Sequence, residues 1–239
     1  MPSELILCVP GPWRDRNEFL GRVVTHEPKG RFMFAGGVLA DIEMKDHVAA
    51  EFEEGVPHLS RAFAIAGQGC VPDTLAAKLE NCPVVFLHFP INLAEQRDRV
   101  VRFSTVLRGA GGLAVKVESA GVAHTWERWF ELLGGSAFDL YCAAVVLVGG
   151  DDRYYSCGMH HFGLADCAVS RRMPIESAAD LINQFNYWCI AERPTLASGH
   201  TFSVSADAPA YRLAQHPDSL HPPDDLFHNP HGVWHLDAV

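Results

Sequence analysis

The chain has 239 residues, of which 48% are hydrophobic and 10% aromatic, so it can build a substantial hydrophobic core. It carries 19 Lys and Arg residues against 29 Asp and Glu residues, which gives a formal net charge of −10 at pH 7. This charge disfavours nucleic acid and anionic membranes as partners, and it is compatible with a basic protein partner.

The amino-terminal sequence "MPSELILCVPGPWRDR" has no basic segment ahead of its short apolar run. No later segment approaches the roughly 18 uninterrupted apolar residues of a membrane-spanning helix. We therefore expect neither a classical secretion signal nor a membrane span. The cysteines show no paired spacing, which favours reduced thiols in a cytoplasm. They are Cys8, Cys70, Cys82, Cys142, Cys157, Cys167 and Cys189.

In the first part of the chain, apolar runs and helix-start signals predict strands and helices in alternation. Asp46 is placed to cap a helix formed by "HVAAEFEE". The predicted elements are a strand at 5–10, a helix at 11–24, a strand at 31–42, a helix at 47–54 and a helix at 72–81.

The middle of the chain predicts a β-α-β unit. Residues 82–90 are almost wholly apolar, as in a strand buried on both faces. A helix beginning at Asn92 follows, and it ends at the glycine cluster "GAGG". The alternating segment 113–121 predicts the next strand, and 125–135 predicts a short helix.

The last hundred residues predict two β-hairpins and one long helix. One hairpin turns at "GGDD" within 137–159, the helix covers 175–193, and the second hairpin covers 201–215. Residues 216–239 are expected to be rich in loops. The fold class is therefore α/β, more closely α+β, with mixed sheets flanked by helices. Residues 1–239 are expected to form a single compact domain or two tightly packed lobes.

The segment "YYSCGMHHFGLADCAVS", residues 154–170, raises the question of a metal or nucleophile site. On a continued strand, Cys157 and His161 share one face, whereas Ser156 and His160 share the other. Cys157 and His161 are then four rises of about 3.3 Å apart, too far for a hydrogen bond. Only a bend at a flanking glycine would bring them together. We therefore expect hydrogen-bonded histidines near a sheet end and cysteines in the core.

The tail offers a second candidate site. His228, His231 and His235 follow an H-x2-H-x3-H spacing, with Asp224 and Asp225 just upstream. Imidazole and carboxylate groups suit zinc or a similar divalent ion. The alternative is an ordinary polar tail.

The segment "DIEMKDHVAAEFEE" has six acidic residues against a single lysine. Such a cluster is either a solvated helix face or an acidic docking surface that accelerates association with a basic partner. Asp151 and Asp152 at the hairpin turn could extend that surface. The six residues are Asp41, Glu43, Asp46, Glu51, Glu53 and Glu54.

Three segments resemble parts of an uncharacterised bacterial family of unknown function. They are "AGGLAVKVESAGVAHTWERW", "YYSCGMHHFGLADCAVS" and "FHNPHGVWHL", and the resemblance runs from about residue 82 to the end. It implies no activity and no catalytic residues. In size and acidity the chain also resembles bacterial immunity proteins, which neutralise toxins of contact-dependent or type VI secretion systems.

Two functional hypotheses follow. The preferred one is a cytoplasmic, non-catalytic binding protein without a cofactor, an immunity protein that occludes a basic toxin such as a nuclease. The acidic residues listed above would then form its binding surface. The alternative is a metal-dependent hydrolase that uses His228, His231 and His235 as ligands.

Overall fold

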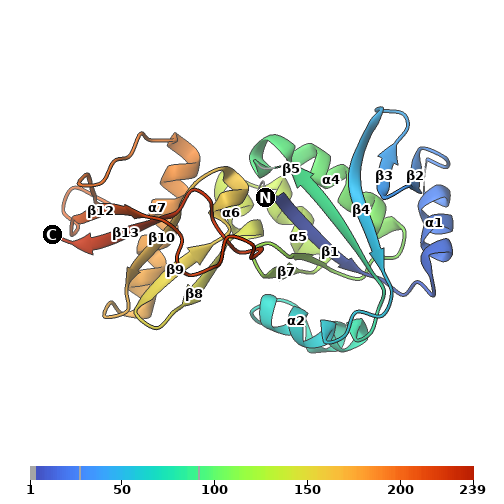
Figure 1. Ribbon diagram of the computed structural model, residues 1–239, viewed down its shortest axis with the longest axis horizontal. Helices are drawn as coiled ribbons and strands as arrows, with labels where there is room; N and C mark the ends of the chain where they lie inside the picture. Colours follow the sequence, from blue (N-terminus) through green and yellow to red (C-terminus); the bar gives the residue numbers. More distant parts are fainter. Residues whose placement is uncertain (1–3, 27, 91) are drawn as a thin grey trace. The chain divides into compact units, whose positions relative to one another are not determined.

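The computed structural model describes residues 4–26, 28–90 and 92–239. The chain divides into two compact units, Glu4–Gly134 and Gly135–Val239. Each unit combines one β-sheet with packed helices, so the predicted α+β class is confirmed (Figure 1). None of the helices in these residues has the length and apolar character needed to cross a membrane.

The N-terminal unit is built on a seven-stranded sheet in which all neighbouring strands are antiparallel. The strand order is β2-β3-β4-β5-β1-β6-β7. The strands are β1 (Glu4–Pro10), β2 (Phe32–Ala35), β3 (Val38–Asp41), β4 (Asp46–Glu53), β5 (Val84–Pro90), β6 (Val115–Val117) and β7 (Val122–His124).

The predicted β-α-β unit is present as β5, the helix α4 (Leu93–Gly109) and β6. The two strands do not pair with each other. Both pair antiparallel with β1, which lies between them, so β5 and β6 run parallel to one another. The first strand of the chain is therefore held at the centre of the sheet by segments far along the sequence.

Helices cover the two faces of this sheet differently (Figure 1). Leu7 and Leu87 are fully buried on the face that also receives Phe103 of α4. On the opposite face, Cys8 packs in a cluster with Phe63 of α2. The helices of the unit besides α4 are α1 (Arg16–Thr25), α2 (Leu59–Ala66), α3 (Asp73–Ala76), the 3₁₀ turn η1 (Ala77–Leu79) and α5 (Trp126–Gly134).

Two predicted elements of this unit have different bounds in the structure, and one helix was missed. The predicted strand 31–42 is two strands, because Gly36 and Gly37 have φ values of 59° and 79° and form a turn between them. The predicted helix 11–24 starts only at Arg16, where the Asp15 side chain accepts a hydrogen bond from the Glu18 N–H at 2.8 Å. Helix α2 was not predicted.

The predicted helix 47–54 is wrong, because this segment lies in strand β4. Its burial alternates with a period of two: Val48 and Ala50 are buried, whereas His47 and Ala49 are exposed. Alanine and glutamate favour helices in isolation, but pairing with β3 and β5 overrides that preference here. Asp46 therefore caps no helix.

The C-terminal unit is built on a six-stranded sheet with the order β11-β12-β13-β10-β9-β8. Its neighbours are antiparallel except β10 and β13, which are parallel. The strands are β8 (Val146–Gly149), β9 (Arg153–Cys157), β10 (Asp166–Ser170), β11 (Thr201–Phe202), β12 (Tyr211–His216) and β13 (Val233–Ala238).

Both predicted hairpins are present, as β8–β9 and β11–β12, and the long helix is α7 (Ile175–Glu192). The start of the first apolar run is instead helix α6 (Ala137–Ala144), because Ser136 and Asp139 form a reciprocal capping box. The tail was expected to be loop-rich, yet it contributes β13 to the middle of the sheet.

We expect Val48→Ala to lower the free energy of unfolding by about 2 kcal/mol, because Val48 is buried. Ala49→Thr, at the exposed neighbouring position, should change it by less than about 0.5 kcal/mol, since threonine suits a strand. Urea denaturation of both variants measures the change in the free energy of unfolding. A clear loss of stability in Ala49→Thr with none in Val48→Ala would contradict the strand assignment.

Candidate functional site

Two acids of the predicted docking surface are part of the fold instead. Asp41 is fully buried, and its carboxylate accepts two hydrogen bonds from Arg31, at 3.0 and 2.8 Å. Arg102 of α4 lies 3.2 Å from the same carboxylate. The Arg31 hydrogen bonds lower the pKa of Asp41 despite burial. The prediction that Asp41 lies on an open acidic face is therefore wrong.

Asp46 has a similar role. Its carboxylate pairs with Arg99 of α4 at 3.0 Å and also with Arg102. The two arginines are three residues apart and so lie on one side of α4. Asp46 thus ties strand β4 to α4, and its charge is compensated within the fold.

The remaining acids of the segment stay accessible. The Glu43 and Glu51 side chains are each 65% exposed, and Glu53 and Glu54 are exposed as well. Glu43 pairs with Arg31 at 3.3 Å. On β4, Glu51 and Glu53 point away from Val48 and Ala50 because side chains alternate across a strand.

Strand register brings further charged residues onto the side of the sheet that Glu51 and Glu53 occupy. Ala49 on this side of β4 pairs with His88 of β5, and His88 pairs with Ile6 of β1. We call this side the polar sheet face. Its charged groups and histidines are Glu4, His47, Glu51, Glu53, His88, Lys116 and Glu118.

The polar sheet face contains specific contacts. His88 Nδ1 lies 3.0 Å from Glu4 Oε2, and His88 Nε2 lies 3.8 Å from Glu51 Oε1. Lys116 Nζ donates to Glu118 Oε1 at 2.8 Å. With four carboxylates against one lysine, the face attracts positive charge.

Cys8 is not a nucleophile for this face. Its side chain is 1% exposed, and burial together with the Glu118 carboxylate raises the pKa of its thiol. A thiol held protonated in this way is inert.

Asp151 and Asp152 lie in the turn between β8 and β9, in the C-terminal unit, and both are exposed. Their assignment to a partner surface stays a prediction.

The segment "YYSCGMHHFG" does not continue as a strand. Strand β9 ends at Cys157, Gly158 has a φ of 122°, and Met159–Phe162 forms the 3₁₀ turn η2. The expected alternation of side chains is therefore wrong beyond Cys157. The rings of His160 and His161 instead pack against each other, with centroids 4.1 Å apart.

After the bend at Gly158, Cys157 and His161 each contact a backbone carbonyl oxygen. Cys157 Sγ lies 3.9 Å from the Phe227 carbonyl oxygen, and burial raises its pKa. His161 Nδ1 lies 3.3 Å from the Ala144 carbonyl oxygen, and burial lowers its pKa to about 4. His160 is also buried, and its pKa falls to about 2, through desolvation first and neighbouring His161 second.

A buried polar network surrounds Asp166 on the neighbouring strand β10. The Asp166 carboxylate accepts hydrogen bonds from Ser156 Oγ at 3.0 Å, the Met159 N–H at 3.2 Å and Asn229 Nδ2 at 2.6 Å. Burial nevertheless raises the pKa of Asp166 to about 7. The network joins β9, β10 and the tail.

Asp218 organises the tail next to this network. Its carboxylate accepts hydrogen bonds from the backbone N–H groups of Leu220 and Asn229, each at 2.9 Å. His221 Nδ1 and His228 Nδ1 lie 3.3 and 3.7 Å from the same carboxylate. Burial acts to raise the pKa of Asp218, but these hydrogen bonds and His221 outweigh it and lower the pKa.

The structure does not gather the predicted metal ligands. His228 Nδ1 lies 3.0 Å from the His221 carbonyl oxygen, whereas His235 lies on β13 and packs against His216. His231 lies between them in the chain, and its backbone N–H donates to Asn229 Oδ1. Among the described residues, no three His, Cys, Asp or Glu side chains are placed to hold a metal ion. The His228, His231 and His235 ligand set is therefore wrong, because β13 carries His235 away.

The two upstream aspartates do not complete a ligand set either. Asp224 and Asp225 lie in the exposed tail, and Asp225 Oδ1 accepts the Phe227 N–H at 2.8 Å. This is a local turn contact.

Sequence reasoning missed Asp166, Asp218, His221 and Asn229. A signal existed for Asp218, because "PDS" is typical of a turn in which aspartate accepts backbone N–H groups two or three residues later. Asp166 gave no such signal, since it is polar at a strand start and its partner Asn229 is 63 residues away.

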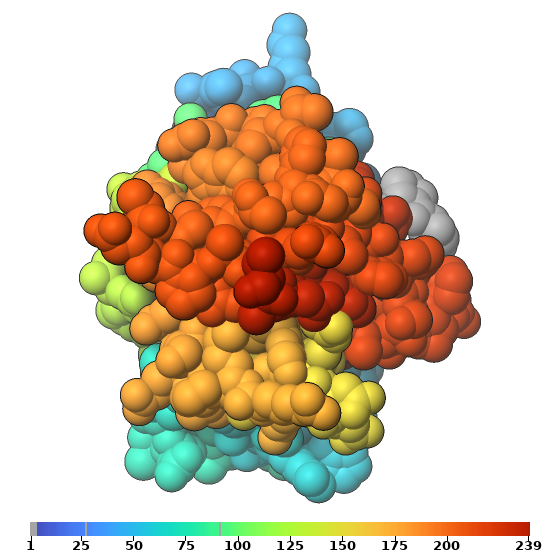
Figure 2. Space-filling model, turned by 90° about the vertical axis from the view of Figure 1, so that its left-hand side faces the viewer, coloured from blue at the N-terminus to red at the C-terminus, as the bar shows by residue number. Residues whose placement is uncertain are grey.

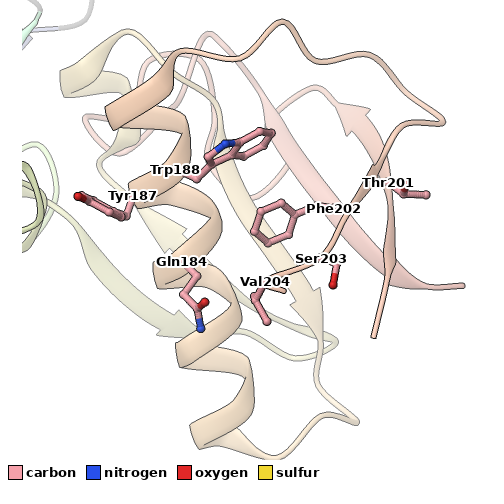
Figure 3. A pocket seen from close by; sticks show the side chains of 7 residues that line it. All are labelled: Gln184, Tyr187, Trp188, Thr201, Phe202, Ser203 and Val204. Carbon is pink, nitrogen blue, oxygen red and sulfur yellow. The ribbon is translucent and has the colours of Figure 1, made fainter. Parts of the chain in front are cut away.

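A separate cavity of about 430 Å³ lies between α7 and the segment that contains β11 (Figure 3). Trp188 of α7 and Phe202 of β11 face each other there, with ring centroids 5.3 Å apart. Gln184 supplies a polar group. None of the residues that line this cavity is charged, so its geometry does not select a ligand class.

Asp41→Asn should lower the free energy of unfolding by about 2 kcal/mol, because it weakens a buried, doubly hydrogen-bonded ion pair. Glu43→Gln, the matched control on the same arginine, should cost less than about 0.5 kcal/mol. Because the pKa of Asp41 is lowered in the folded state, the stabilisation by its ion pair is present above about pH 4 and is lost as the pH falls further. Urea denaturation at two pH values tests this, and equal effects of the two variants would refute it.

Asp166 should affect stability in the opposite direction. The pKa of Asp166 is about 7 in the folded protein and about 3.9 in the unfolded chain. Its contribution to the free energy of unfolding therefore rises by about 1 kcal/mol per pH unit as the pH falls from 7 towards 4. His160 and His161 act oppositely, because their lowered pKa values cost stability below about pH 6.5. The difference between the wild type and Asp166→Asn isolates the carboxyl group. A difference that does not change with pH would rule out the raised pKa.

Comparisons with protein-family models, with curated proteins and with solved structures found no match. The candidate site therefore rests on its own geometry.

Proposed function

We propose that the protein is a non-catalytic binding protein whose polar sheet face receives a basic protein partner. The observation that carries this proposal is the strand register, which puts Glu51 and Glu53 of β4 on the same face as Glu4 and Glu118. Carboxylates from separate segments thus act together on one surface.

The charges on this face remain available to a partner. Within the described residues, Glu51 pairs with His88 at 3.8 Å, and Glu53 and Glu54 form no ion pair. Ile6 and Phe86 lie on the same face and are only partly buried. Apolar side chains of this kind supply anchors, while the surrounding carboxylates steer the approach.

Within this class we infer a bacterial immunity protein that acts in the cytoplasm and occludes a basic toxin, such as a nuclease. A nuclease binds phosphate groups with Lys and Arg side chains. Carboxylates held in fixed positions on a β-sheet can form ion pairs with those Lys and Arg side chains in place of the phosphates. The net charge of −10 adds long-range attraction.

The decisive experiment uses the product of the neighbouring gene. We expect the two proteins to purify together, and co-expression to rescue cells from the toxicity of that product. If the neighbouring product neither binds nor is neutralised, the immunity proposal fails.

A charge-reversal variant tests the surface. Replacing Glu51, Glu53 and Glu54 with lysine should lower the association rate with the partner by about tenfold at low ionic strength and flatten its salt dependence. The fold should remain intact because these positions are exposed. Stopped-flow association and thermal unfolding measure the two properties.

The matched control replaces Asp180, Glu192 and Asp207, exposed acids of the C-terminal unit, with lysine. It changes the net charge by the same amount, so it should slow association much less. Equal slowing by the two variants would show that only overall charge matters and would refute the polar sheet face as the docking surface.

A further inference from the structure

The C-terminal unit contains a second cavity, of about 350 Å³, on the sheet face opposite α7. The β8–β9 turn forms one side and residues 217–220 of the tail form the other. Figure 2 shows these two segments, in yellow and orange-red, next to each other on the surface. The volume is within the range of small-molecule sites.

Arg153 provides an unused donor in this cavity. Its Nη2 donates to Asp237 Oδ1 at 3.0 Å, whereas its buried Nη1 has no hydrogen-bond partner within the described residues. A buried guanidinium nitrogen without a partner is costly, and a carboxylate is the group that satisfies it best.

Asp151 and Asp152 provide negative charge at the same cavity. Both are exposed, and neither carboxylate forms an ion pair with the residues that the structure describes. Asp151, Asp152 and Arg153 all line the cavity, so it presents both negative and positive charge.

The rest of the lining is largely apolar. Ala168 and Val233 are buried in its floor, and Leu220 is 50% exposed at its edge. Burial, with Arg153 as the second cause, lowers the pKa of His235 to about 4, so this lining histidine is neutral at pH 7. Arg153 is therefore the cationic group of the cavity at that pH.

We propose that this cavity binds a free α-amino acid with an apolar side chain, its carboxylate on Arg153, its ammonium group on Asp151 and Asp152, and its side chain against Leu220 and Val233. A simple anion would be repelled by the two aspartates, and a simple cation would leave Arg153 Nη1 without a hydrogen-bond partner. A zwitterion satisfies both charges. This inference goes beyond the proposed function and does not depend on it.

Isothermal titration calorimetry of the full chain with L-leucine and L-phenylalanine tests the proposal. We expect saturable binding at millimolar concentrations or below. N-acetyl-L-leucine lacks the ammonium group and L-leucinamide lacks the carboxylate, so each should bind at least about tenfold more weakly. These two compounds also mimic chain termini, so they separate a free amino acid from a peptide end.

Two variants complete the test. Asp151→Asn combined with Asp152→Asn should weaken L-leucine binding about tenfold without affecting the fold, because both residues are exposed. Asp180→Asn combined with Asp207→Asn, outside the cavity, is the control and should leave binding unchanged. Absence of binding by either amino acid, equal binding of a blocked analogue, or unchanged binding in the cavity variant would overturn the proposal.

Discussion

The hydrogen bonding of β1 to both β5 and β6 is the constraint on which the N-terminal unit depends. This pairing fixes the register of the central strands, and the register determines which side chains share a face. A slip of one residue would move Leu7 to the polar side and Cys8 to the α4 side. The hydrophobic core and the acidic surface are therefore two results of one alignment.

The acidic residues of segment 41–54 show how burial separates structural from accessible charge. Asp41 is buried and would be costly without Arg31 and Arg102, so its charge is used within the fold. Glu51 lies on the same face of β4 as Glu53, two residues away, and its exposed carboxylate is free to act outside the fold. Carboxylates thus serve two purposes within one short segment, inside the fold and on its surface.

The sequence predicted most elements whose signals are local. Strand β5 and helix α4 were predicted because a short apolar run and a helical face are visible without tertiary information. Strand β4 was mistaken for a helix because its Ala and Glu residues favour helices, and only its neighbours in the sheet decide otherwise. The same limit applies to the candidate sites. The exposure of Glu51 and Glu53 was expected, whereas the partners of Asp41 and Asp166 lie far along the chain.

Strand β13 has a consequence for folding kinetics. In the described sheet it is the link between β10 and the β11–β12 hairpin, and it pairs in parallel with a strand more than sixty residues earlier. Such long-range pairing is slow, because the entropy of closing a large loop must be lost first. Until it forms, β10 and β12 expose unpaired edges that can pair with other chains. Aggregation during refolding should therefore depend on how fast this single strand docks.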